Sequence, residues 1–253
     1  ARFYMKYPFV RPKYYYSLFQ DVVGFVKKPT NVEAVGKSTK FKIYDTIGLF
    51  IVKILFLIPI SLLVGLIHDP ENLTKASMAE RFSPLMLVLV TVLILPTLEE
   101  VAFRLSLKFR PIYLALTSSV FLYYVLTKAV FATKISAVGE SFITRFSLSI
   151  GVGLLLYLII NMRSVSEKVS AIWSNHFRTI YYLSCITFAW IHVFNYEMNL
   201  MNLLFLPLIT LPQLMSGIIS GYTRVAFGFK YPLFFHMATN MIALGLSLLP
   251  FAD

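Results

Sequence analysis

Three ionisable side chains lie within six residues of one another in an otherwise apolar stretch, namely Glu99, Glu100 and Arg104. Glu100 and Arg104 are four residues apart, so they share one face of a helix and can form a structural ion pair. Glu99 is rotated about 100° from Glu100 and has no partner on its own helix, which leaves a partly desolvated carboxylate suited to act as a general base. Pro96 cannot donate a hydrogen bond to the Val92 carbonyl, so we expect a kink just before these residues.

Two histidines also lie inside apolar stretches. His192 follows Phe188 by four residues, and His236 precedes Asn240 by four residues on the same helix face. A single histidine in such a place is often only an interhelical hydrogen-bonding group. Together, a carboxylate, two imidazoles and a carboxamide on three helices can activate a water, stabilise an oxyanion and protonate a leaving nitrogen. This set predicts hydrolysis of an amide bond.

A zinc mechanism is the chemical alternative, because two histidines and a carboxylate can bind zinc and leave a position open for water. The chain has no His-Glu-x-x-His run, so we favour the glutamate mechanism and expect no cofactor. Cys185 is the single cysteine and precedes His192 by seven residues, or about two turns of one helix. That position indicates packing rather than a nucleophile.

The composition of the 253 residues sets the class of protein that must position these groups. Hydrophobic residues make up 58% of the chain and charged residues 14%, and the mean hydropathy is +0.74. A soluble domain has about 45–50% apolar and about 25% charged residues. These values exclude a disordered chain, a disulfide scaffold, a coiled coil and a solenoid. They predict an all-α fold, a polytopic bundle of transmembrane helices.

Membrane spans can be placed because a helix needs about 20 mostly apolar residues to cross the hydrocarbon core. Two prolines, Pro207 and Pro212, interrupt one of the apolar segments. We predict seven spans, at residues 47–67, 84–105, 111–131, 142–162, 179–195, 199–221 and 231–251. They form a domain over residues 47–253, preceded by a basic and aromatic segment at residues 1–46.

The basic residues that give the chain its net charge of +11 are distributed as the predicted topology requires. Residues 1–47 hold nine Lys and Arg, and alternate loops are basic, as the positive-inside rule expects for a cytoplasmic amino end and an external carboxyl end. This distribution explains most of the charge without nucleic acid. The segment 1–46 is either an interfacial anchor against anionic lipid or an ordinary juxtamembrane tail.

The motifs Glu-Glu-x-x-x-Arg, Phe-x-x-x-His and His-x-x-x-Asn, in this order on separate membrane helices, resemble the CPBP family. This family comprises the CAAX-processing and bacteriocin-processing intramembrane endopeptidases. The resemblance covers roughly residues 85–250. It includes Gly217, Gly221, Arg224 and Gly228, which resemble the small residues of a tight turn before the last motif.

The resemblance implies a role for each candidate residue. Glu99 activates the water with the help of His192, His236 and Asn240 stabilise the oxyanion, and Glu100 and Arg104 are structural. The implied substrate is a peptide or protein associated with the lipid bilayer. We expect a multi-pass protein of a bacterial inner membrane, with the four catalytic groups converging in a polar cavity open to the cytoplasmic side.

Two features depart from the family pattern. Glu99 and His192 are 93 residues apart, more than is usual in the family, and two added spans at about 111–162 account for the extra length. These spans offer a surface for a protein partner. Leu105 stands where the family commonly has glycine. Two other functions remain open: a catalytically silent member that acts as a scaffold or subunit of a membrane complex, and a proton-coupled transporter.

Overall fold

The computed structural model describes residues 8–34 and 36–247 of the chain. These residues form helices joined by short connections, and the described part contains no strand. The prediction of an all-α fold is therefore confirmed for the described residues.

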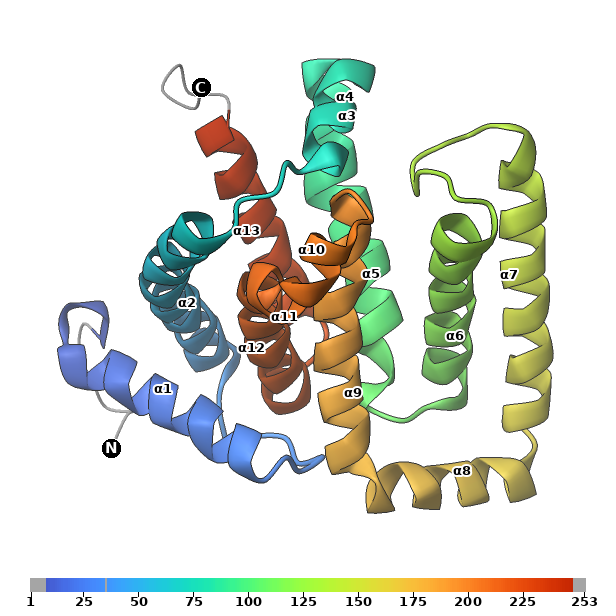
Figure 1. The fold of residues 1–253 in the computed structure, drawn as a ribbon. Helices are drawn as coiled ribbons and strands as arrows, with labels where there is room; N and C mark the ends of the chain where they lie inside the picture. The colour runs from blue at the N-terminus through green and yellow to red at the C-terminus, as the bar shows by residue number, and fades with distance from the viewer. Residues whose placement is uncertain (1–7, 35, 248–253) are drawn as a thin grey trace.

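The long helices run side by side and form the bundle in Figure 1. Two further helices, α1 (Pro12–Lys27) and α8 (Arg163–Asn175), lie across one end, which we call the basal end. The opposite, apical end carries α3 (Leu73–Arg81). The bundle comprises α2 (Thr39–Ile67), α4 (Pro84–Val88) with η3 (Leu89–Ile94), α5 (Leu95–Phe103) and η4 (Leu105–Leu107), α6 (Pro111–Val125) with η5 (Leu126–Val130), α7 (Glu140–Ile160), α9 (Phe177–Trp190), α12 (Leu211–Phe227) and α13 (Lys230–Ser247).

Four helical segments are long and apolar enough to cross a membrane, at Thr39–Ile67, Pro84–Leu107, Pro111–Val130 and Ser141–Ile160. They correspond to the first four predicted spans, although the first begins well before residue 47. This composition is that of a membrane protein. The number of seven spans and the orientation of the termini stay predictions.

The other three predicted spans differ from simple helices. α9 has 14 residues and continues into the 3-10 helix η6 (Ile191–Asn195). The sixth is divided into α10 (Leu200–Leu204), α11 (Leu206–Ile209) and α12, because Pro207 and Pro212 each stand in the first turn of a new helix. α13 has 18 described residues, and the predicted end of the seventh span lies outside the described residues.

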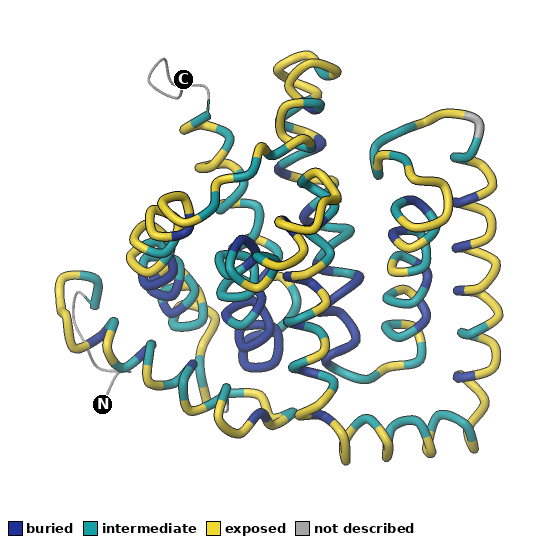
Figure 2. Tube along the Cα trace, in the orientation of Figure 1, coloured by how far each residue is buried: buried dark blue, intermediate teal, exposed yellow. Residues whose placement is uncertain are grey.

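The core of the bundle lies between α1, α2, α12 and α13, and Figure 2 shows the buried residues concentrated on α12 and α5. α1 contributes Tyr14, Leu18 and Val22 to this core. Gly48 allows the close approach of α1 and α2, since a Cβ atom there would overlap the Leu18 side chain. Within the segment before residue 47, residues 12–27 thus pack on the bundle as a helix.

α6 and α7, which were predicted as added spans, form a hairpin that packs closely through small residues. A Cβ atom on Gly153 would lie 2.8 Å from Cβ of Ser119, and the Ser119 hydroxyl donates to the Ser149 carbonyl at 2.7 Å. Small residues spaced four apart are a common way for membrane helices to approach each other. Arg145 of α7 is completely buried and donates to Oγ1 of Thr127 at 2.8 Å, which ties the two helices together.

Candidate active site

The helix that carries Glu99 and Glu100 is preceded by a π-helix, η3, in which backbone bonds span five residues. The last of them runs from the Leu95 N–H to the Val90 carbonyl. The next donor would be Pro96, which has no N–H, so the Thr91 carbonyl loses its π-helical partner. Asn240 of α13 replaces it, with Nδ2 donating to the Thr91 oxygen at 2.9 Å. The sequence predicted that the Val92 carbonyl would lack a backbone donor. Because the bonds of the π-helix span five residues instead of four, the carbonyl that lacks a donor is that of Thr91.

The other end of α5 is fixed by Arg224 from α12. Its Nε donates to the Arg104 carbonyl at 3.1 Å, and its Nη2 donates to the Leu105 carbonyl at 2.8 Å. Carbonyls at a helix C-terminus lack α-helical partners, and the Arg104 carbonyl accepts here from both Arg224 and the Leu107 N–H. The Ser184 hydroxyl of α9 also donates to the Phe103 carbonyl. α5 is therefore held at both ends by side chains from other helices.

Glu100 and Arg104 lie on one face of this part of the chain, as their spacing predicts, and both side chains are fully buried. Nη1 of Arg104 is 3.8 Å from Oε1 of Glu100, which is longer than a hydrogen bond. Three Arg104 nitrogens and Oε2 of Glu100 have no hydrogen-bond partner in the described part of the chain. The Arg104 guanidinium instead lies over the Phe188 ring, 3.7 Å from its centroid.

His236 is the residue that joins the two glutamates. Its Nδ1 donates to Oε1 of Glu100 at 2.9 Å. Its Nε2 then faces Oε2 of Glu99 at 3.6 Å. The Glu99 side chain is 17% exposed, whereas the Glu100 side chain is completely buried. The two adjacent carboxylates thus differ in exposure. Glu100 is buried and bonds the histidine, whereas Glu99 is partly exposed.

His192 lies in η6, just beyond the end of α9. Its Nδ1 donates to the Phe188 carbonyl at 2.7 Å, so the neutral imidazole carries a lone pair on Nε2. The His192 and His236 rings both contact the Phe188 ring edge to face, with centroid distances of 5.0 and 5.9 Å. The Arg104 guanidinium also lies over the Phe188 ring. Phe188 therefore contacts three of the polar side chains, those of Arg104, His192 and His236. Its place in Phe-x-x-x-His was the only sequence signal for that role.

Asn240 shares a face of α13 with His236, as their four-residue spacing predicts. Its side chain bonds the Thr91 carbonyl and forms no hydrogen bond with Glu99, His192 or His236. The role in oxyanion stabilisation therefore stays a prediction for Asn240. The contact with the π-helix is a positioning role that the sequence did not reveal.

Lys53 of α2 is a charged residue of this region that the sequence analysis did not select. It is 1% exposed, its Nζ donates to Oγ1 of Thr239 at 2.8 Å, and it lies 4.8 Å from the centroid of the Phe235 ring. Lys53 also lies within electrostatic range of Glu100. Its position as a lone cation inside the first apolar span was the available signal, because such residues are costly in a membrane and usually have a use.

Gly217 and Gly221 do not belong to a turn, contrary to the sequence-based expectation. Both lie inside α12, where added Cβ atoms would meet Arg104 Nη2 at 3.1 Å and the Tyr181 ring at 2.7 Å, respectively. They allow α9 and Arg104 to approach α12. Gly228 forms the turn between α12 and α13, and its φ of +112° is a conformation that suits glycine.

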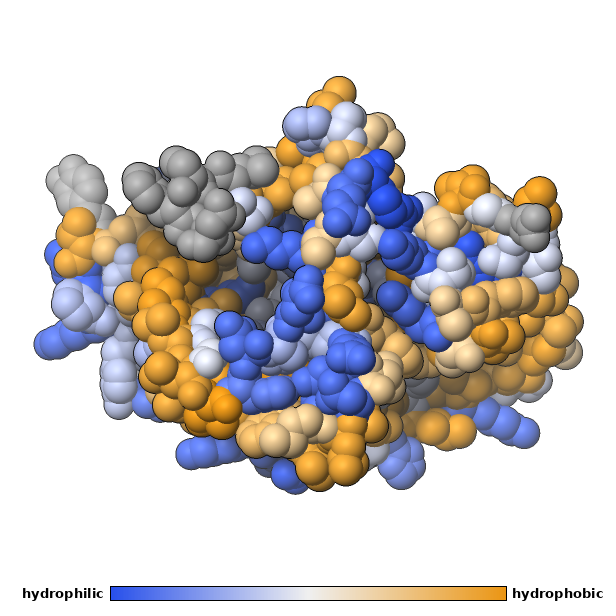
Figure 3. All heavy atoms as spheres, turned by 45° about the horizontal axis from the view of Figure 1, so that its top comes forward, coloured by the Kyte–Doolittle hydropathy of each residue, from blue (hydrophilic) through white to orange (hydrophobic). Residues whose placement is uncertain are grey.

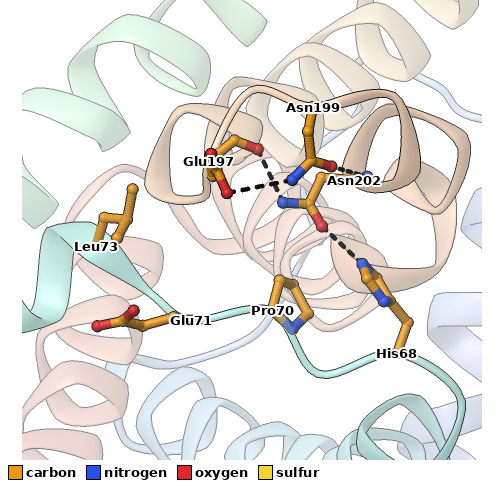
Figure 4. A pocket seen from close by; sticks show the side chains of 7 residues that line it. All are labelled: His68, Pro70, Glu71, Leu73, Glu197, Asn199 and Asn202. Atoms are coloured by element: carbon orange, nitrogen blue, oxygen red, sulfur yellow. Dashed lines mark hydrogen bonds between the residues drawn. The ribbon is translucent and has the colours of Figure 1, made fainter.

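No three His, Cys, Asp or Glu side chains within the described ranges are arranged to bind a metal ion. A cavity of about 200 Å³ lies elsewhere, between the connections that follow α2 and η6. Figure 4 shows His68 donating to Asn202 there, from Nε2 to Oδ1 at 2.6 Å, with Glu71 and Glu197 beside them. None of the four predicted catalytic residues lines this cavity.

The apical end of the molecule gathers hydrophilic side chains, as Figure 3 shows with this end turned forward, and apolar side chains cover the flanks. The predicted cavity around Glu99, open to the cytoplasmic side, is not identified by the structure and stays a prediction.

Comparison with known proteins gives no relative for this chain. No family model matches it, and neither a curated protein nor a solved structure does. The resemblance to the CPBP family therefore rests on the three motifs alone.

Proposed function

We propose that this protein is an intramembrane endopeptidase of the CPBP type, which hydrolyses a peptide bond of a membrane-associated substrate with water activated by Glu99. The observation that carries the proposal is the position of the His236 imidazole, bonded through Nδ1 to buried Glu100 and directed through Nε2 toward Glu99. A carboxylate facing an imidazole in an apolar helix bundle is a suitable pair for proton transfer.

The proposed reaction assigns one step to each group. Glu99 takes a proton from water as the oxygen attacks the carbonyl carbon, and the same proton then passes to the leaving nitrogen. His192, whose Nδ1 is bonded to the Phe188 carbonyl, uses Nε2 to orient the water. His236 and the second amide hydrogen of Asn240 stabilise the oxyanion. Glu100 holds His236 in place, and Arg104 is structural through its charge beside Glu100 and its contact with the Phe188 ring.

A topology accompanies this function. We propose seven spans with a cytoplasmic amino end, in a bacterial inner membrane, so that the basal end faces the cytoplasm. The basic connections at this end support the orientation under the positive-inside rule. Zinc remains the alternative activator, and it would require Glu99, His192 and His236 to move together, since they do not form a ligand group here.

The test is a cleavage assay with the purified chain in lipid vesicles, incubated with a mixed library of lipidated and apolar peptides. Mass spectrometry identifies new peptide ends. We expect cleavage that falls by a factor of about 10² or more in Glu99→Gln, because general-base catalysis contributes on that order. Glu71→Gln, a glutamate at the apical cavity, is the matched control and keeps full activity.

Two outcomes contradict the proposal. Cleavage at the normal rate by Glu99→Gln excludes the glutamate mechanism. Absence of cleavage of every peptide by the folded protein favours the scaffold, for which the exposed apolar face of α7 provides a docking surface, with Ile143 74% and Leu158 67% exposed. The transporter is supported by the buried ionisable residues Lys53 and Glu100 and the partly buried His236, and proton uptake driven by a membrane potential would identify it.

A further inference from the structure

α8 has the pattern of a helix that lies in the plane of a membrane surface. It runs across the basal end between the lower ends of α7 and α9 (Figure 1). Its 13 residues extend about 20 Å and are too polar to cross a bilayer. The apolar side chains recur at helical spacing on one face, with Arg163 and Glu167 on the opposite one. They are Val165, Val169, Ile172 and Trp173.

The protein covers this apolar face only in part, because Val165, Val169 and Trp173 are half-buried. No α8 residue is buried, and Ile172 remains 56% exposed. Trp173 alone is tied to the bundle, with Nε1 donating to the Ser106 carbonyl at 2.8 Å. α1, the other helix at this end, differs because its apolar face is buried in the core. α8 is therefore held by Trp173 and by its connections to α7 and α9, and it still leaves part of its apolar face exposed at the level where the spans end.

Exposed cations lie at the same end of the bundle as α8. Lys168 lies on the border between the apolar and polar faces of α8, where a long side chain can bury its stem and keep its charge in water. Arg110, Arg178 and Lys230 stand at the basal ends of α6, α9 and α13, each over a tyrosine ring, at 5.2, 5.6 and 5.3 Å from the centroid. Tyrosine beside lysine or arginine is typical of the headgroup region of a membrane.

The charge of this surface determines which lipid fits it. The basal connections at residues 108–110, 161–178 and 228–230 carry six Lys and Arg against one glutamate. The apical connections at residues 68–83, 131–139 and 196–199 carry three Lys and Arg against four carboxylates. We propose that α8 and the cations beside it form a docking surface for anionic phospholipid headgroups of the leaflet at the basal end. This surface does not depend on the proposed peptidase activity.

The chain contains two tryptophans, so one can report on this surface and the other can serve as a control. Trp190→Phe leaves Trp173 of α8 as the only tryptophan, which can be excited selectively over the tyrosines. The protein is placed in vesicles of phosphatidylcholine with about one third phosphatidylglycerol, in which either lipid carries brominated acyl chains. We expect brominated phosphatidylglycerol to quench Trp173 at least about threefold more per mole than brominated phosphatidylcholine, since each nearby cation attracts an anionic surface. High salt should reduce this preference.

The reverse variant, Trp173→Phe, leaves Trp190 at the far end of α9, where it is 49% exposed, and should show no preference between the two lipids. The double substitution Lys168→Gln with Arg178→Gln should abolish the preference at Trp173. The matched apical pair, Lys75→Gln with Arg81→Gln, should leave it unchanged. Equal quenching of Trp173 by the two lipids overturns the proposal, and this comparison needs no lysine or arginine variant to fold.

Discussion

Replacement of Asn240 by alanine tests whether α13 stabilises the π-helix in front of Glu99. The substitution removes the 2.9 Å bond to the Thr91 carbonyl, which Pro96 cannot replace with a backbone donor. An unsatisfied buried carbonyl costs about 1–3 kcal/mol, and hydrogen bonds between membrane helices average about 0.6 and reach about 1.7 kcal/mol. Because Thr91 is only partly buried, we expect the free energy of unfolding to fall by about 1 kcal/mol.

The assay is a double-mutant cycle measured by reversible unfolding in mixed micelles. In Pro96→Ala, residue 96 can donate to the freed carbonyls, so Asn240→Ala should lose half or more of its effect on unfolding. Thr187→Ala is the control for additivity, because its hydroxyl is exposed and bonds within its own helix. An equal cost of Asn240→Ala in both backgrounds refutes the coupling between Asn240 and the π-helix.

The same cycle separates two roles of Asn240 in the proposed reaction. If Asn240 acts only by positioning α5, Pro96→Ala should restore part of the cleavage lost in Asn240→Ala. If its amide stabilises the oxyanion, cleavage stays lost in the double variant although the fold is recovered.

Three further outcomes are expected. Gly153→Leu should lower the free energy of unfolding by about 1–3 kcal/mol through overpacking against α6, measured by reversible unfolding, whereas Gly151→Leu meets no atom within 4 Å and should be tolerated. Arg104→Gln leaves the buried charge of Glu100 with a weaker partner and should cost about 3–5 kcal/mol, whereas the exposed Arg163→Gln should leave the thermal unfolding midpoint unchanged. Incubation with a strong chelator should leave cleavage unchanged, and elemental analysis should find well under one metal per chain.

The sequence predicted those parts of the fold that depend only on residues close together in the chain. The apolar length of residues 111–130 and 141–160 is sufficient to define two spans, and the spacing of Glu100 and Arg104 is sufficient to put them on one face. The broken sixth span was also visible, because Pro207 and Pro212 interrupt it. The π-helix before Pro96 could not be predicted from the sequence. A proline lacks the N–H of a regular helix, and either a kink or a π-helix can accommodate that loss.

The contacts between helices could not be predicted, because they depend on how each helix is rotated against its neighbours. Gly217 and Gly221 illustrate this point: both a turn and a helix–helix contact require small residues, and only the packing of Tyr181 against α12 distinguishes them. Lys53 is a second case, since its partners on α13 lie 182 and 186 residues away in the chain.

The division of roles between Glu99 and Glu100 shows how such packing determines chemistry. Adjacent carboxylates have the same intrinsic acidity, and helix geometry alone gives them different directions. It is the rotation of α13 that brings Nδ1 of His236 to the buried Glu100. An imidazole held through one nitrogen presents the other nitrogen in a fixed direction, and here that direction is toward Glu99. The buried glutamate therefore positions the histidine, and the partly exposed glutamate is the one to which we assign the reaction in the proposed function.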